Sequence, residues 1–224
     1  MIRLENITKI YEKHGQTLRA LEDVNLHVPK GDFLAITGPS GSGKTTLMNI
    51  LGCLDRPTGG TYLLEGTTVE GLGGAAAADI RNRKIGFIFQ SFNLIGSMSA
   101  LENVELPLVL RGESRKSRRQ KALEALERVG LQTRAGHRPA ELSGGQQQRV
   151  AIARVLAAQP PLILADEPTG NLDGVTSREI LSILQQLHGE GQTIVMITHD
   201  EGIAAAAPRQ MRMESGRLSN LETN

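Results

Sequence analysis

Short apolar runs with turn residues at their ends predict the β-strands of this chain. Phe33–Thr37, Leu162–Ala165 and Thr193–Ile197 are almost wholly apolar, which is typical of strands buried on both faces of a parallel sheet. Two N-terminal segments, 2–10 and 21–28, place polar residues between apolar ones, as half-buried strands do. We expect these two segments to form two strands near the N-terminus.

Apolar residues at helical spacing predict helices between the strands. In 44–54 and 176–188 they recur three or four positions apart, and the second segment lies between two predicted strands, as in a βαβ unit. The Gly/Ala stretch 71–78 predicts a turn that runs into a helix, and 98–158 predicts a mostly helical insertion in one α/β core. Buried stripes are expected at Leu47, Ile50, Leu51 and Leu54, and in the insertion at Ala122, Leu123, Leu126 and Val129.

Composition and charge narrow the class of protein. The chain has 224 residues, 39% of them hydrophobic, which suits one globular domain, and no apolar run approaches the ~18 residues of a membrane span. Lys and Arg number 25 and Asp and Glu 24, so the net charge of +1 removes the general electrostatic case for a nucleic-acid partner. We interpret the basic run 115–119 as the solvated face of a helix.

A glycine-rich loop between a predicted strand and a predicted helix indicates phosphate binding. Its sequence, Gly38-Pro39-Ser40-Gly41-Ser42-Gly43-Lys44-Thr45, matches the pattern G-x-x-x-x-G-K-[ST]. The glycines let successive backbone N–H groups point into one concavity, and the start of the helix adds the positive end of its dipole. Lys44 would neutralise terminal phosphates, and Thr45 would offer its hydroxyl to Mg²⁺. A plain glycine-rich turn is the disfavoured alternative, because the flanking elements are those that the motif requires.

Two acidic residues follow the predicted strand 162–165. They stand at the carboxyl end of a parallel strand, where ligands bind in open α/β sheets. Asp166 is suited to hold Mg²⁺ through water, and Glu167 to accept a proton from an attacking water. Taken alone, the pair is equally well explained as the start of an acidic loop; the phosphate loop favours the functional interpretation.

The segment Leu142–Gln146 predicts a second anion site. Ser143 is a good N-cap for the helix that follows, and Gly144 and Gly145 leave backbone N–H groups uncovered at its start. The alternative is a plain capped helix.

In this order, the three motifs resemble the nucleotide-binding domain of an ABC transporter ATPase, and the resemblance extends from Ile2 to about Leu218. It implies that Tyr11 stacks on adenine, Gln90 reaches Mg²⁺ and the attacking water, and His199 contacts the γ-phosphate. Asp173 would belong to the D-loop of the family. Without the resemblance, Tyr11 is a half-buried strand tyrosine, Gln90 a turn residue and His199 a strand-end histidine. Stacking needs the ring alone, so Tyr11→Phe is expected to be nearly silent.

The resemblance also implies a site shared between two copies of the chain. Two ATP molecules would be sandwiched head to tail in a homodimer, with Mg²⁺ at Thr45, Gln90 and Asp166. Glu167, His199, Gln90 and Lys44 would be catalytic. The implied ATP contacts are Tyr11, the residues Gly38 to Thr45 and Thr46 on one chain, and Ser143, Gly144, Gly145 and Gln146 on the other.

The implied fold is a P-loop NTPase core with two additions. The core would comprise 1–90 and 159–224, including the N-terminal antiparallel β subdomain. A helical subdomain at 91–158 would carry the signature segment Leu142–Gln146.

Segments 49–55, 87–108 and 166–173 further resemble the subgroup of macrolide exporters, lipoprotein-releasing complexes and cell-division ATPases. Macrolide exporters fuse this domain to a membrane domain, whereas this chain ends at Asn224, so we expect a separate transmembrane permease subunit. The chain would then lie peripherally on the cytoplasmic face of the inner membrane. Leu94 and Ile95 would face the groove that takes a coupling helix of the permease.

Two alternatives stay open. A cell-division-type regulator would use ATP to signal across the membrane without transport. A soluble DNA-maintenance ABC ATPase is less favoured, because the sequence has no long coiled coil, zinc cysteines or second ATPase head.

Overall fold

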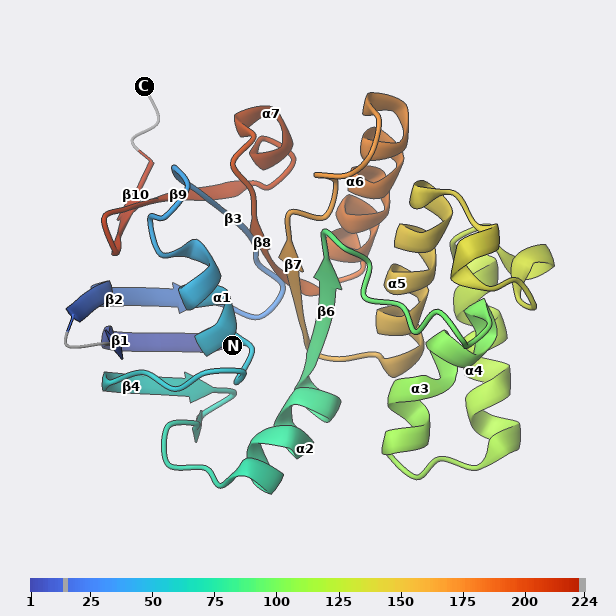
Figure 1. Ribbon diagram of the computed structural model, residues 1–224, viewed down its shortest axis with the longest axis horizontal. Helices are drawn as coiled ribbons and strands as arrows, with labels where there is room; N and C mark the ends of the chain where they lie inside the picture. Colours follow the sequence, from blue (N-terminus) through green and yellow to red (C-terminus); the bar gives the residue numbers. More distant parts are fainter. Residues whose placement is uncertain (14–15, 222–224) are drawn as a thin grey trace.

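Two β-sheets form the frame of the protein (Figure 1), whose computed structural model describes residues 1–13 and 16–221. The first sheet is antiparallel, in the order β2-β1-β4-β5. Its strands are β1 (Ile2–Lys13), β2 (Gln16–Val28), β4 (Gly59–Leu64) and β5 (Thr67–Thr68). The alternating segments 2–10 and 21–28 lie within β1 and β2, so the predicted antiparallel subdomain is confirmed.

The second sheet has the order β10-β9-β3-β8-β7-β6 and is parallel except for β10. Its strands are β3 (Phe33–Thr37), β6 (Ile85–Phe89), β7 (Leu162–Asp166), β8 (Thr193–Ile197), β9 (Arg209–Glu214) and β10 (Arg217–Asn220). The three predicted apolar runs are the adjacent strands β3, β8 and β7. Their carboxyl ends share one edge of the sheet, which brings the loops after them together.

Helices cover both faces of the second sheet. Helix α1 (Lys44–Leu51) packs between the two sheets, and α6 (Gly174–Gly189) covers the opposite face. Helix α2 (Gly74–Lys84) leads into β6, and the short α7 (Glu201–Ala204) follows β8. The first helix ends before the predicted Leu54 because the chain turns at Cys53, whose φ is 53°, and this leaves Leu54 51% exposed.

The insertion between β6 and β7 is helical and lies at the end of the molecule away from the antiparallel sheet (Figure 1). It comprises α3 (Ala100–Leu110), α4 (Arg115–Arg128), the 3₁₀ turns η1 (Gln132–Arg134) and η2 (Pro139–Glu141), and α5 (Gly144–Ala158). Ala122, Leu126 and Val129 are buried as predicted, but Leu123 is 38% exposed, because a stripe spaced i, i+4, i+7 suffices for the packed face. No helix in the described ranges is long and apolar enough to cross a bilayer.

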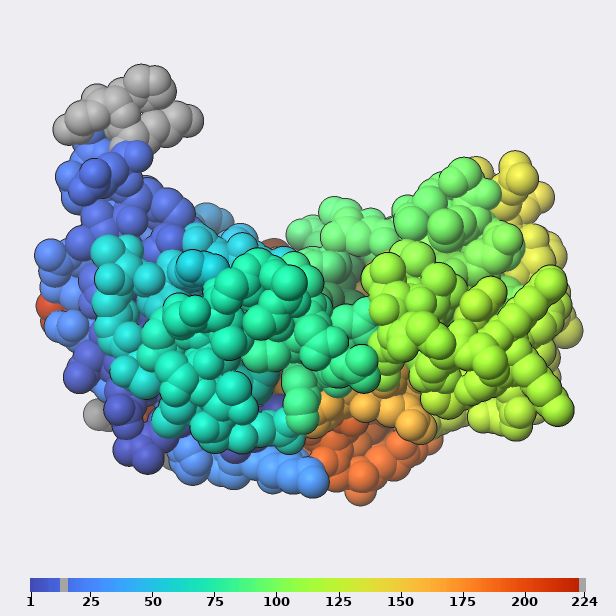
Figure 2. Space-filling view, turned by 90° about the horizontal axis from the view of Figure 1, so that it is seen from below, coloured from blue at the N-terminus to red at the C-terminus, as the bar shows by residue number. Residues whose placement is uncertain are grey.

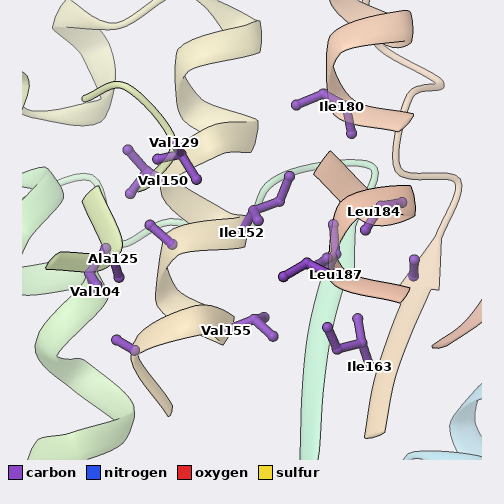
Figure 3. Close-up of a cluster of buried hydrophobic side chains, with 14 of the residues drawn as sticks. Val104, Ala125, Val129, Val150, Ile152, Val155, Ile163, Ile180, Leu184 and Leu187 are labelled. Carbon is purple, nitrogen blue, oxygen red and sulfur yellow. The ribbon is translucent and has the colours of Figure 1, made fainter. Parts of the chain in front are cut away.

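Buried apolar residues form one cluster on each face of the parallel sheet. Side chains alternate along β3, so Phe33 and Ala35 join the cluster on the α6 face while Leu34 and Ile36 join the cluster around α1. The first cluster continues into the insertion through α5 (Figure 3). Burial on both sides of α5 therefore fixes the insertion against the sheet.

Candidate functional site

A cleft of about 630 Å³ opens at the carboxyl edge of the parallel sheet. Most of the residues proposed from the sequence meet there. Those that line it are Tyr11, Ser40, Gly41, Gly43, Lys44, Thr45, Thr46, Gln90, Asp166, Glu167 and His199. They come from β1, the loop before α1, the first turn of α1, and the carboxyl ends of β6, β7 and β8, so the order of the strands assembles the site.

The phosphate loop has a backbone that requires glycine. Gly38 has a φ of +147°, and a Cβ there would lie 2.1 Å from the carbonyl oxygen of Met213. Gly43, at the start of α1, has a φ of +108° and equally little room. Among the described residues, the buried hydroxyl of Ser42 has no hydrogen-bond partner, and the start of α1 has no side-chain cap. Unpaired polar groups in such a cradle fit an anion with several acceptor oxygens.

Lys44 crosses this loop and is held inside it. Its Nζ donates to the carbonyl oxygens of Gly38 and Pro39, at 2.7 and 2.9 Å, and the residue is 9% exposed. Burial lowers the pKa of Lys44, and the charges of Glu167 and Asp166 oppose that shift. The ammonium is thus positioned before any ligand binds.

The two acids after β7 have different surroundings. Burial and the adjacent charge of Glu167 raise the pKa of Asp166, while Lys44 lowers it. Glu167 has a left-handed backbone, with a φ of 46°, which is uncommon outside glycine and typical of functional sites. Its Oε1 accepts from the backbone N–H of His199 at 2.9 Å and lies 2.7 Å from Nδ1 of the same residue. This pair of contacts fixes the orientation of the carboxylate.

Gln90 follows β6 and is held from one side by Asn171. Its Nε2 donates to Oδ1 of Asn171 at 3.1 Å, and Nδ2 of Asn171 donates back to the Gln90 carbonyl oxygen at 3.0 Å. The amide nitrogen is therefore turned toward Asn171, which leaves Oε1 as the atom suited to a cation or a water.

The segment Leu142–Gln146 lies apart from the cleft, at the start of α5 in the insertion. Ser143 is the N-cap, as predicted: its hydroxyl accepts from the Gln146 N–H at 3.3 Å, and Gln146 Oε1 accepts from the Ser143 N–H at 3.0 Å. Gly145 also has a packing reason, because a Cβ would lie 2.4 Å from Cγ2 of Thr176. Asp173 caps α6 by accepting from the N–H groups of Val175 and Thr176.

The sequence interpretation missed one wall of the cleft. Leu18, Arg19 and Ala20 of β2 line it together with Ser215 and Gly216. A hydrogen bond from the Gly216 N–H to the Ser42 carbonyl oxygen, 2.9 Å long, joins this wall to the phosphate loop. These residues carry no local motif, and pairing over long stretches of sequence brings them here.

The described residues contain no group of three or more His, Cys, Asp or Glu that could hold a metal ion. Mg²⁺ in nucleotide sites is typically held by one or two carboxylates together with phosphate oxygens. The donors at this cleft, the Thr45 hydroxyl, Gln90 and Asp166, fit that pattern.

Comparisons with known proteins agree with this geometry. The family model described as ABC transporter matches residues 21–170. The chain belongs to this family. It is an ABC ATPase of the α/β P-loop class, and it binds adenine nucleotides as the family does.

Two relatives show how closely this ABC ATPase matches others of its kind. YvrO of Bacillus subtilis, an uncharacterized ABC transporter ATP-binding protein, is 53% identical over 218 residues, covering 97% of this chain and 95% of YvrO. The macrolide export ATP-binding/permease protein MacB of Rhodospirillum rubrum is 49% identical over 218 residues, covering 97% of this chain but 34% of MacB.

Two solved structures are similar over the full length of both chains. The dimeric structure of MJ0796, a bacterial ABC transporter cassette, has a TM-score of 0.91 and 46% identity to this ABC ATPase. A dimeric post-hydrolysis state of the same cassette, bound to ADP and Pi, has a TM-score of 0.91 and 44% identity.

Proposed function

We propose that this ABC ATPase works as a head-to-tail homodimer that drives a separate membrane subunit of the export type. One observation supports the dimer. The chain has two glycine-containing helix starts suited to anions, Gly38–Thr45 and Leu142–Gln146, and only the first of them lines the cleft. A second copy would bring its Leu142–Gln146 to the open cleft. The dimeric relatives support this assembly.

The side chains of the cleft would divide the work of hydrolysis. Lys44 would neutralise charge on the transferred phosphate, and Glu167 would accept the proton of the attacking water. His199, tied to Glu167, would keep the carboxylate and the water aligned. Mg²⁺, held by Thr45, Gln90 and Asp166, would supply electrostatic stabilisation of the phosphate oxygens.

The insertion would act as a helical subdomain at 91–158, and the core would comprise 1–90 and 159–224. This division is supported by where the chain leaves the sheet after β6 and returns at β7. The subdomain would present Ser143, Gly144, Gly145 and Gln146 to the partner.

A groove of about 750 Å³ supports the proposal that a membrane subunit docks on this chain. It is bordered by α2, β6, α3 and α5, and α2 and α3 are neighbours on the face that Figure 2 shows from below. Stacked rings of Phe87 and Phe89, with centroids 5.2 Å apart, form part of its apolar lining. Asn93, in the loop after Gln90, lines the groove. In the same loop Leu94 is partly buried against the core and Ile95 is 38% exposed. A coupling helix of the permease would dock here, which would place the chain on the cytoplasmic face of the membrane.

The permease is proposed from the relatives. MacB is an ATP-binding/permease protein, and the match to this chain covers about a third of MacB. The other relative, YvrO, matches along almost its entire length, which supports an arrangement with the two parts on separate chains.

Mixing two inactive variants tests the shared site. Lys44→Ala removes the charge of the phosphate loop, and Ser143→Arg blocks the second loop. In a mixed dimer one site collects both defects and the other has neither. Random pairing makes about half of the dimers mixed, each with one good site, so ATP hydrolysis by the mixture should recover to roughly a quarter of wild type.

The control is Ser114→Arg. Ser114 caps α4 in the same subdomain, so this variant loses a comparable cap without touching the proposed interface, and it should keep its turnover. Zero recovery in a mixture proven to contain mixed dimers would contradict a site shared between independent chains.

Tyr11→Ala should weaken nucleotide binding. The ring lines the cleft, and a stacked aromatic contributes roughly 1 kcal/mol, so the dissociation constant should rise about five- to tenfold. Isothermal titration with ADP measures it directly. An unchanged affinity would mean that Tyr11 does not touch the base.

A further inference from the structure

We propose that Asp55 and Lys9 are positioning residues that hold the Tyr11 ring in place for the base, acting through the Tyr11 hydroxyl. The inference rests on the proposed stacking of Tyr11 on adenine and extends it to two residues that do not line the nucleotide cleft.

Three side chains form a closed set of contacts beside the cleft. The Tyr11 hydroxyl donates to Oδ2 of Asp55 at 2.7 Å, and Lys9 Nζ donates to Oδ1 of Asp55 at 2.6 Å. The ammonium of Lys9 also lies 4.8 Å from the centroid of the Tyr11 ring. The hydroxyl and one face of the Tyr11 ring are therefore restrained, and a base that stacks on the ring takes the face that Lys9 leaves open.

The two carboxylate oxygens of Asp55 bind different partners. Oδ1 accepts from Lys9 and also from the backbone N–H of Arg56 at 2.7 Å, so Oδ2 is left for Tyr11. Burial raises the pKa of Tyr11, and the hydrogen bond to Asp55 raises it further, so the hydroxyl stays protonated and keeps donating. The side chains of Lys9 and Asp55 are 12% and 30% exposed, so solvent screens this pair less than an ordinary surface pair.

The backbone around Tyr11 and the backbone around Asp55 both place these contacts beside the nucleotide site. The register of β1 with β2 shifts between the pairs Lys9–Leu21 and Ile10–Arg19, which leaves Ala20 as an unpaired extra residue. β-Bulges of this kind change the direction of side chains and are common next to active sites. Asp55 follows α1, and its N–H donates to the carbonyl oxygen of Asn49 in that helix at 3.2 Å. The Tyr11 ring is thus tied to the helix whose other end carries the phosphate loop.

This geometry changes the expectation for the tyrosine hydroxyl. If the ring alone mattered, Tyr11→Phe would be silent, because stacking does not use the hydroxyl. Since the hydroxyl is the link to Asp55, we expect Tyr11→Phe to weaken binding of a base-containing nucleotide and to leave phosphate binding unchanged.

The test compares ADP with pyrophosphate, which lacks the base, by isothermal titration of the full chain. The variants are Tyr11→Ala, Tyr11→Phe, Asp55→Ala, and Tyr11→Phe combined with Asp55→Ala. Asp55→Ala should raise the dissociation constant for ADP about fivefold and Tyr11→Phe about threefold, and the combination should be no weaker than Asp55→Ala alone, because residues in one network are not additive. Affinity for pyrophosphate should stay within about twofold throughout.

Two further variants serve as controls. Glu65→Ala removes a carboxylate of similar exposure in the turn between β4 and β5, where it pairs with Lys84 of α2 at 2.6 Å, and it should change neither affinity. Asp55→Asn keeps the shape but has one acceptor oxygen in place of two, so it should weaken ADP binding less than Asp55→Ala. It replaces Asp55→Ala if that variant does not fold.

Each contrary outcome has a distinct meaning. Unchanged ADP affinity in both Asp55 variants, equal losses for ADP and pyrophosphate, or full additivity with Tyr11→Phe would overturn the positioning role. Unchanged ADP affinity in Tyr11→Ala would instead overturn the proposed stacking, and the positioning role with it.

Discussion

A Glu167→Gln variant should bind ATP but hydrolyse it about 10²- to 10⁴-fold more slowly than wild type, because removal of a general base costs this much. The substitution keeps the shape of the site. The Gln oxygen can still accept from the backbone N–H of His199, as Oε1 of Glu167 does at 2.9 Å. The amide cannot take a proton from the attacking water. ATP-bound dimers should then accumulate and appear by size-exclusion chromatography with ATP and Mg²⁺.

The matched control for this variant is Glu201→Gln. Glu201 lies in the first turn of α7, shortly after His199, and its side chain is 85% exposed. It should retain the turnover and the oligomeric state of the wild type. A Glu167→Gln variant that hydrolyses ATP near the wild-type rate would show that Glu167 is not the base.

The sequence predicted the fully buried strands better than the partly buried ones. The bounds of β3 and β8 are as predicted, since both are five-residue runs buried throughout and followed by polar or glycine residues. In β9, two of six residues, Met211 and Met213, are buried, and β4 begins with two glycines, so neither carries a clear strand pattern. Tertiary pairing, which no local pattern reports, makes these segments strands.

The site shows the same division between local and long-range information. The phosphate loop was predictable because its function lies in consecutive backbone groups, which a short motif specifies. Ser215 and Gly216 reach the cleft through pairing of segments far apart in the chain. The link between Tyr11 and Asp55 joins residues 44 positions apart and has no signature in the sequence.

The phosphate loop depends on the charge of one side chain. Lys44 is buried, its Nζ is held by two carbonyl oxygens, and its charge lowers the pKa of Asp166. Removing it would take a cation from the phosphates and leave Asp166 and Glu167 without a compensating charge. A hydrogen bond to a charged group is worth about 1.5–3 kcal/mol, so loss of Lys44 predicts nucleotide binding about 10- to 100-fold weaker.

Lys44→Ala should therefore lose ATP hydrolysis almost completely. The ammonium of Lys44 would stabilise negative charge that develops as the phosphoryl group is transferred. Its removal should therefore lower the hydrolysis rate by a further ~10²–10³-fold, beyond the effect of weaker binding. Phosphate release measures the rate, and titration with ADP measures the affinity. Lys84→Ala, which removes an exposed lysine paired with Glu65, should change neither quantity. Wild-type turnover in Lys44→Ala would contradict the assignment of hydrolysis to this cleft, because no other described residue holds a cation within the phosphate loop.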